Sequence, residues 1–133
     1  MGTWAEDSFG NDTACDWAYS LEKQTDMSFI EKTIEKVLNA EFDNCDAEEA
    51  IAAAEVVARL QGHWGERNAY TEPADKWVEK SGLKPDKTLV QKVHQAIDRI
   101  LSEPSELLEL WQEDDEFEKW KISVMDLKSR VCV

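Results

Sequence analysis

The sequence predicts an all-α fold, a compact bundle of about five to seven helices. Apolar residues recur at spacings of three and four through most of the 133 residues, which is the period of an amphipathic helix. No stretch alternates apolar and polar residues for long enough to predict a strand. Hydrophobic residues make up 42% of the chain and include six Trp, enough for one core at this length. We therefore expect a single domain over residues 1–133, with residues 1–10 packed on the bundle as an ordered arm.

Two amphipathic helices are expected at the start of the chain, over residues 12–24 and 28–39. Asn11 or Asp12 is placed to cap the first helix, because both side chains accept hydrogen bonds from free backbone N–H groups. Ser28, with a glutamate three residues later, has the pattern of a capping box at the start of the second.

A third helix, over residues 47–61, is apolar nearly all round and is therefore expected to be the central one. It follows a polar loop at residues 41–45. Asp46 and a glutamate three residues later predict its start, and Gly62 predicts its end. The residues expected near the centre of the molecule are Ile51 and Ala54.

The second half of the chain predicts four further helices after a loop at residues 63–70. A short helix over residues 73–80 ends at Gly82, and a longer one is introduced by Pro85 and Asp86. Another short helix precedes the acidic run at 113–116. The last helix has an apolar stripe at regular spacing: Phe117, Trp120, Val124, Leu127 and Val131.

The net charge of −14 is unevenly distributed. Residues 1–55 carry a balance of −11, residues 56–102 a balance of +2, and residues 103–133 a balance of −5. Such a potential repels nucleic acid and anionic membranes and attracts basic partners. The simpler interpretation is that acidity only keeps the protein soluble.

Neither a secretory signal nor a membrane span is predicted. The N-terminus has no basic start and no apolar run, and the richest apolar stretch, residues 50–60, is too short to cross a bilayer. The three cysteines, Cys15, Cys45 and Cys132, are odd in number and lack paired spacing. These features favour a reducing compartment, and we expect a cytoplasmic protein.

No catalytic residue, metal site or cofactor site is predicted. The two histidines, His63 and His94, have no cysteine or carboxylate at a metal-binding spacing, and the five glycines form no phosphate loop. A Cys–His nucleophile pair stays open, because such residues meet only in the fold.

Asp12 and Asp16 are the alternative to this negative prediction. They are four residues apart, hence on one helix face, and with Glu6 and Asp7 nearby they would offer carboxylates to Mg²⁺ or Ca²⁺. We favour a structural role, since acidic residues in a first helical turn interact with its dipole and free N–H groups.

Three parts of the sequence carry a family resemblance: the alanine-rich segment 48–58, the segment 96–111, and an N-terminal motif of Trp4, Phe9, Asn11, Asp12, Asp16 and Trp17. Together they resemble DUF4259, a family of unknown function, over nearly the whole chain. The resemblance implies a free-standing bacterial domain, sometimes found at toxin–immunity loci such as those of contact-dependent growth inhibition. It implies no activity and no catalytic residues.

A structural account of the N-terminal motif is sufficient. Its three aromatic residues pin the arm to the bundle, Asn11 or Asp12 caps the first helix, and Asp16 accepts hydrogen bonds from backbone or indole N–H groups. The alternative is a functional site built on the same cluster.

The leading hypothesis is a non-enzymatic immunity protein that binds a basic toxin, an RNase or DNase, and occludes its active-site cleft. Trp64, Tyr70 or Trp77 would supply an aromatic anchor. The alternatives are a small metal-binding protein or enzyme using the N-terminal carboxylates, and a general adaptor or regulatory domain. The acidic residues expected to face the partner form two segments: Glu41, Asp43, Asp46, Glu48 and Glu49, and Glu113, Asp114, Asp115, Glu116 and Glu118.

Overall fold

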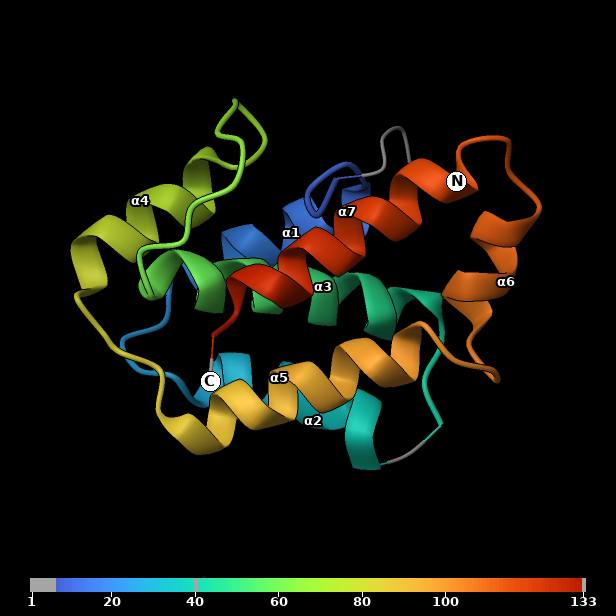
Figure 1. The fold of residues 1–133 in the computed structure, drawn as a ribbon. Coiled ribbons are helices and arrows are strands. Elements are labelled where there is room, and N and C mark those ends of the chain that lie inside the picture. The colour runs from blue at the N-terminus through green and yellow to red at the C-terminus, as the bar shows by residue number, and fades with distance from the viewer. Residues whose placement is uncertain (1–6, 40, 133) are drawn as a thin grey trace.

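The computed structural model describes residues 7–39 and 41–132, and within these it contains helices and no strand (Figure 1). The prediction of an all-α fold is therefore confirmed. The expected packing of Trp4, and of the arm as far as residue 6, lies outside the described residues. The helices are α1 (Asp12–Leu21), α2 (Ser28–Asn39), α3 (Asn44–Leu60), α4 (Glu72–Ser81), α5 (Lys87–Ile100), α6 (Glu106–Gln112) and α7 (Phe117–Arg130).

Helix α3 is the centre of the molecule, as its uniformly apolar sequence predicts. Every residue from Ala50 to Leu60 is buried, and Ala54 has no exposed surface. All six other helices pack against α3. Six alanines in this helix let its neighbours approach closely, so the polar residues Glu55 and Arg59 are enclosed as well.

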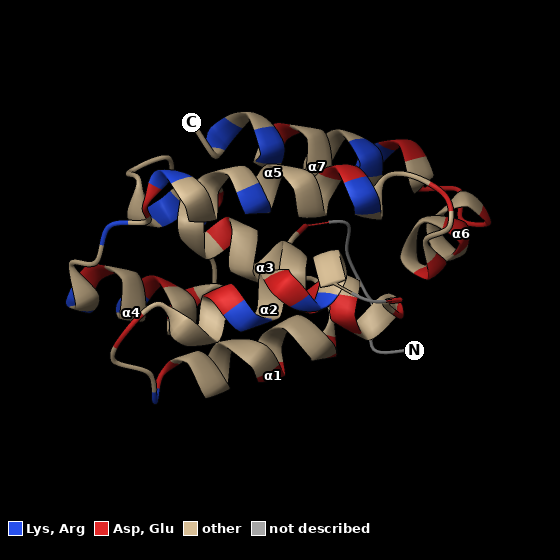
Figure 2. Ribbon diagram, turned by 90° about the horizontal axis from the view of Figure 1, so that it is seen from below, with Lys and Arg blue, Asp and Glu red and all other residues tan. Residues whose placement is uncertain are grey.

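The other helices surround α3 in pairs (Figure 1). Helices α2 and α5 pack together along one side, and α1 and α4 along another. Helix α7 lies against both α3 and α5, and α6 bridges α3 and α7. Figures 1 and 2 both place α4 and α6 at opposite ends of the bundle. None of the described helices is long and apolar enough to cross a lipid bilayer.

Side-chain caps begin three of the helices near the predicted places. Asn11 Oδ1 accepts from the backbone N–H of Ala14 at 2.7 Å and so caps α1. Asp86 caps α5 in the same way, and Ser105 caps α6. Helix α1 is shorter than predicted and ends at Leu21, where the chain continues as a turn.

Two predicted caps are wrong. Ser28 is already the first residue of α2, and its backbone N–H and hydroxyl both donate to Asp26 Oδ1, at 2.9 and 2.6 Å. Helix α3 begins at Asn44, inside the expected loop, because the capping box is formed by Asp43 and Asp46 rather than by Asp46 and Glu49.

The glycine that ends α3 adopts the left-handed conformation that its sequence position predicts. Gly62 has φ of +87°. Its N–H donates to the carbonyl of Arg59, and the N–H of His63 donates to that of Ala58, which is the Schellman pattern. This turn directs the 63–71 loop across α3, where it forms one wall of a groove described below.

Candidate functional site

Acidic residues gather at the end of the molecule that α6 forms (Figure 2). They come from the α5–α6 connection, from α6 itself and from the turn between α6 and α7. The exposed members are Glu103, Glu106, Glu109, Glu113, Asp114, Asp115 and Glu116. We call these residues, together with Glu41, the acidic end.

A surface groove brings one residue of the first acidic segment, Glu41, beside acidic residues of α6. Glu41, from the α2–α3 connection, lines it together with Glu106 and Glu109 of α6, and its volume is about 330 Å³. The guanidinium of Arg99 also lines it and lies 5.5 Å from the centre of the Phe42 ring. Sequence reasoning missed Glu106 and Glu109, although their spacing of three in a short helix places both on one face.

Four of the predicted contact residues in the first acidic segment cap a helix, are buried or are half-buried. Asp43 and Asp46 form the capping box of α3. Glu48 is buried, with 5% of its surface exposed, so its prediction as a surface contact is wrong. Glu49 is half-buried, and burial, with the nearby carboxylates of Asp46 and Asp43, raises its pKa against the opposing effect of Lys36.

The second acidic segment is exposed throughout. The turn is shaped by Asp114, whose Oδ1 accepts from the backbone N–H of Glu116 at 2.8 Å. Glu116 also pairs with Lys119, at 2.8 Å. Glu113 and Asp115 take no part in these interactions, and their carboxylates, like that of Glu118 on α7, are exposed.

The predicted aromatic anchors do not lie at the acidic end. Tyr70 is 53% exposed and lies two residues before α4, the helix at the opposite end of the bundle from α6. Trp64 is half-buried, with the guanidiniums of Arg67 and Arg59 at 4.5 and 5.4 Å from its ring centre. Trp77 is not available as an anchor, because it is buried and its indole N–H donates to the carbonyl of Gln24.

Among the described residues of the N-terminal motif, the aromatic side chains pack in the interior. Phe9 and Trp17 are buried. Trp17 stacks on Phe29 with ring centres 5.3 Å apart, and its indole N–H donates to Thr33 Oγ1 rather than to Asp16. Asp12 and Asp16 are both exposed.

The alternative of a carboxylate metal site gains no support from the described residues, among which no group of three His, Cys, Asp or Glu side chains is placed to hold a metal ion. Glu6, one of the residues considered, lies outside that part. Burial, followed by the charges of Asp12, Asp16 and Asp7, raises the pKa of the Cys15 thiol, which disfavours the thiolate that a nucleophile requires.

Both histidines hold the C-terminal segment. His63 Nδ1 lies 2.8 Å from the carbonyl oxygen of Arg130, and His94 Nε2 contacts that of Val131. Each histidine therefore has a backbone carbonyl partner near the end of the chain.

A buried charge cluster lies beside α3, and the sequence did not predict it. Glu55, 3% exposed, accepts four hydrogen bonds: from the Ser8 hydroxyl at 3.0 Å, from Arg59 Nε at 3.0 Å, and from Arg130 Nη1 and Nη2 at 2.7 and 2.9 Å. Arg59 also donates to Asp75 of α4, whose second oxygen accepts from Thr71 Oγ1 at 2.7 Å. We call Glu55, Arg59, Asp75 and Arg130 the Glu55 cluster.

The Glu55 cluster contains two carboxylates and two guanidiniums, so its charges balance. Burial by itself raises the pKa of Glu55, but the hydrogen bonds and charges of Arg130 and Arg59 outweigh burial and hold that pKa below its ordinary value. The only sequence signal was the Glu–Arg spacing of four in an otherwise apolar helix. Arg130 is 75 residues from Glu55 in the sequence, so no local pattern connects them.

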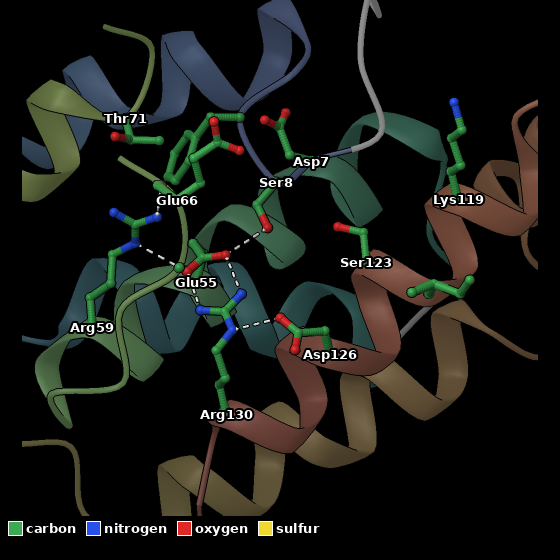
Figure 3. A pocket seen from close by; sticks show the side chains of 13 residues that line it. Asp7, Ser8, Glu55, Arg59, Glu66, Thr71, Lys119, Ser123, Asp126 and Arg130 are labelled. Carbon is green, nitrogen blue, oxygen red and sulfur yellow. Dashed lines mark hydrogen bonds and ion pairs between the residues drawn. The ribbon is translucent and has the colours of Figure 1, made fainter. Parts of the chain in front are cut away.

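A groove of about 480 Å³ opens above the Glu55 cluster (Figure 3). One wall is the segment from Asp7 to Phe9, another is the outer face of α7, and a third is the loop at residues 65 and 66. Glu55, Arg59 and Arg130 lie at its floor. The residues nearer its opening are Asp7, Glu66, Lys119, Ser123 and Asp126. Ile122 of α7 also lines the groove.

The fold and these surfaces define a small all-α protein with an acidic end and a buried, charge-balanced cluster. Residues 2–123 match DUF4259, a domain of unknown function, and the chain therefore belongs to this family. No curated protein and no solved structure matches the chain.

Proposed function

We propose that this protein is a non-enzymatic binding protein, specifically an immunity protein that neutralises a basic toxin, most concretely a nuclease. The observation that carries the proposal is the acidic end, where Glu41 lines one groove with Glu106 and Glu109 of α6, and the acidic turn follows α6 in the chain. In this proposal the protein works by occlusion and needs no catalytic group of its own.

Charge complementarity gives the physical reason. A nuclease binds a chain of phosphates, so its cleft presents Lys and Arg side chains. Clustered carboxylates attract the same cleft, accelerate encounter and exclude the nucleic acid once bound. Speed matters for an immunity protein, because the toxin must be bound before it reaches its substrate.

The acidic end is held on a packed support, which favours tight binding. Leu107 and Leu108 of α6 are buried, and Trp111 at its end stacks on Trp120 of α7 with ring centres 5.7 Å apart. A surface that is already ordered loses less conformational entropy on binding than a flexible acidic tail does.

Affinity capture from the source bacterium tests the proposal. The bait is the full chain, as wild type, as Glu113→Lys with Asp115→Lys, or as Asp16→Lys with Glu22→Lys. Both double variants change the net charge equally, at exposed positions, but only the first lies at the acidic end. We expect wild type and the α1 variant to retain one basic protein, and the acidic-end variant to lose it.

The captured protein is then expressed alone and together with the bait. An immunity protein prevents the growth arrest that its toxin causes, and the acidic-end variant fails to prevent it. A captured partner without toxicity would instead identify a general adaptor. Equal loss of capture in both double variants would show that total charge, and not the acidic end, governs binding.

A further inference from the structure

We propose that the loop at residues 63–71 and the segment 130–132 form a latch, a conformational device whose two parts open and close together. The loop contains no helix, and the segment begins at the last residue of α7. The inference goes beyond the proposed function, since no residue of the acidic end belongs to the latch. It is carried by the reciprocal contacts between the two parts and by the way in which the loop is anchored.

The two parts of the latch bind each other in both directions. Arg130 Nη1 donates to the carbonyl of His63 at 3.3 Å, and the carbonyl oxygen of Arg130 lies 2.8 Å from His63 Nδ1. Gln61, at the end of α3 where the loop starts, donates to the carbonyl of Cys132 at 2.8 Å and accepts from its N–H at 2.9 Å. Neither part can move away without breaking contacts that the other makes.

The loop lacks an apolar anchor in the bundle. None of residues 63–70 is buried. The half-buried ring of Trp64 lies against the guanidiniums of Arg59 and Arg67. Arg59 Nη2 also donates to the carbonyl of Glu66, at 2.8 Å. Because segments with few buried apolar contacts open at a low free energy, the order of this loop depends on arginine side chains.

Arg130 joins both parts of the latch to the Glu55 cluster (Figure 3). Its guanidinium donates twice to Glu55, at 2.7 and 2.9 Å, and is fixed by these bonds. Gly65 of the loop packs on the same guanidinium, and a Cβ added to Gly65 would lie only 3.0 Å from Arg130 Nη1. A larger residue at this position would therefore have to displace the guanidinium.

The segment 130–132 is the firmer part of the latch. Val131 is buried, and its carbonyl oxygen contacts His94 Nε2 of α5. The loop, by contrast, is one wall of the groove of about 480 Å³, so the groove keeps its shape only while the latch is closed. A molecule that binds either part in its closed form will therefore stabilise the other.

Native-state hydrogen exchange of the full chain tests the latch. The reporter amides are those of Asn68 and Thr71 in the loop and Cys132 in the segment, whose N–H groups are bonded within the latch. We expect the three to share one opening free energy, lower than that of amides in the middle of α3. Arg130→Met should accelerate all three by the same factor, at least about tenfold, because it removes hydrogen bonds between charged groups.

Lys128→Met is the matched control. It removes another ion-paired cation from the end of α7, but Lys128 pairs with Asp98 of α5 and not with the loop. This variant should leave the three amides unchanged. Gly65→Ala is a second test that removes no polar group, and it should accelerate Cys132 as well as the loop by displacing the shared guanidinium.

Separate behaviour of the two parts would overturn the latch. Such a result is acceleration of Asn68 and Thr71 without Cys132, or of Cys132 without the loop, in either Arg130→Met or Gly65→Ala. Equal opening free energies at these amides and in α3 would also overturn it, since the latch would then open only when the whole bundle unfolds. If Arg130→Met does not fold, the wild-type comparison and Gly65→Ala decide the question.

Discussion

Glu55 is the residue on which the interior depends most, because it connects α3 to α7 and to the segment before α1. Removing one member of a buried ion pair leaves the other without compensation, which typically costs about 3–5 kcal/mol. Glu55→Gln keeps the shape and removes the charge that faces Arg59 and Arg130. We expect a loss of this size in the free energy of unfolding, measured in urea.

Asp98→Asn is the control for that measurement. Asp98 pairs with Lys128, but 58% of its side chain is exposed. Exposed pairs contribute at most about 1 kcal/mol, so this variant should unfold close to wild type. Equal effects of the two substitutions would mean that the Glu55 cluster contributes no more to the free energy of unfolding than a surface ion pair does.

The lowered pKa of Glu55 predicts a pH dependence. Because the pKa of Glu55 is lower in the folded than in the unfolded protein, its carboxylate contributes stability that is fully present above the ordinary pKa of about 4.5. This contribution is lost as the pH falls through the lower folded value. Urea unfolding between pH 7 and pH 3 should therefore show a smaller decrease in stability for Glu55→Gln than for wild type, and parallel curves would contradict the assignment.

The sequence could reveal Glu55 and Arg59 only as interruptions in an apolar helix. Their spacing suggests a pair, but the burial of both depends on the segment before α1, the loop before α4, α4 itself and α7, which all contact them. The same limit explains Glu48, which sits among acidic neighbours in the sequence and is nevertheless enclosed. Residue type indicates charge, whereas burial is a property of the assembled bundle.

The start of α3 shows the corresponding limit for a whole element. The uniformly apolar sequence predicted both the helix and its central position, because such a pattern is visible in the local sequence alone. Two overlapping cap patterns, Asp43 with Asp46 and Asp46 with Glu49, have the same spacing. The earlier one forms, with Asp46 N–H donating to Asp43 Oδ1 at 2.8 Å, and the helix gains almost one further turn.

Substitution at the two candidate caps separates them. Asp43→Ala removes the half of the box in which Asp43 Oδ1 accepts from the N–H of Asp46, and is expected to lower the free energy of unfolding by about 1 kcal/mol, the usual value for an N-cap. Glu49→Ala lies within the helix and should cost less than about 0.5 kcal/mol, as at other partly exposed positions. Thermal melts of both variants measure these effects. A larger loss of stability for Glu49→Ala than for Asp43→Ala would contradict the structure.

At the scale of the whole molecule, the acidic end opposes stability. The net charge is −14, and seven carboxylates from residues 103 to 116 are exposed close together at one end. Like charges at this separation repel one another in the folded state, and salt screens them over about 10 Å at 0.1 M. A surface that costs stability and serves only solubility does not need to be concentrated at one end, whereas a surface for a basic partner does.

Reversing two charges at the acidic end should therefore raise stability while removing the proposed partner binding. In Glu113→Lys with Asp115→Lys, both side chains are exposed and neither shapes the turn, so folding contacts are preserved. We expect a higher melting temperature than wild type at low salt, by an amount corresponding to less than about 1 kcal/mol, and a difference that shrinks as salt is added. Differential scanning calorimetry at two ionic strengths measures both effects. The Asp16→Lys with Glu22→Lys variant, where the carboxylates are more dispersed, should gain less. If the acidic-end variant melted below wild type at low salt, its loss of partner would have to be attributed to damaged folding instead of a damaged interface.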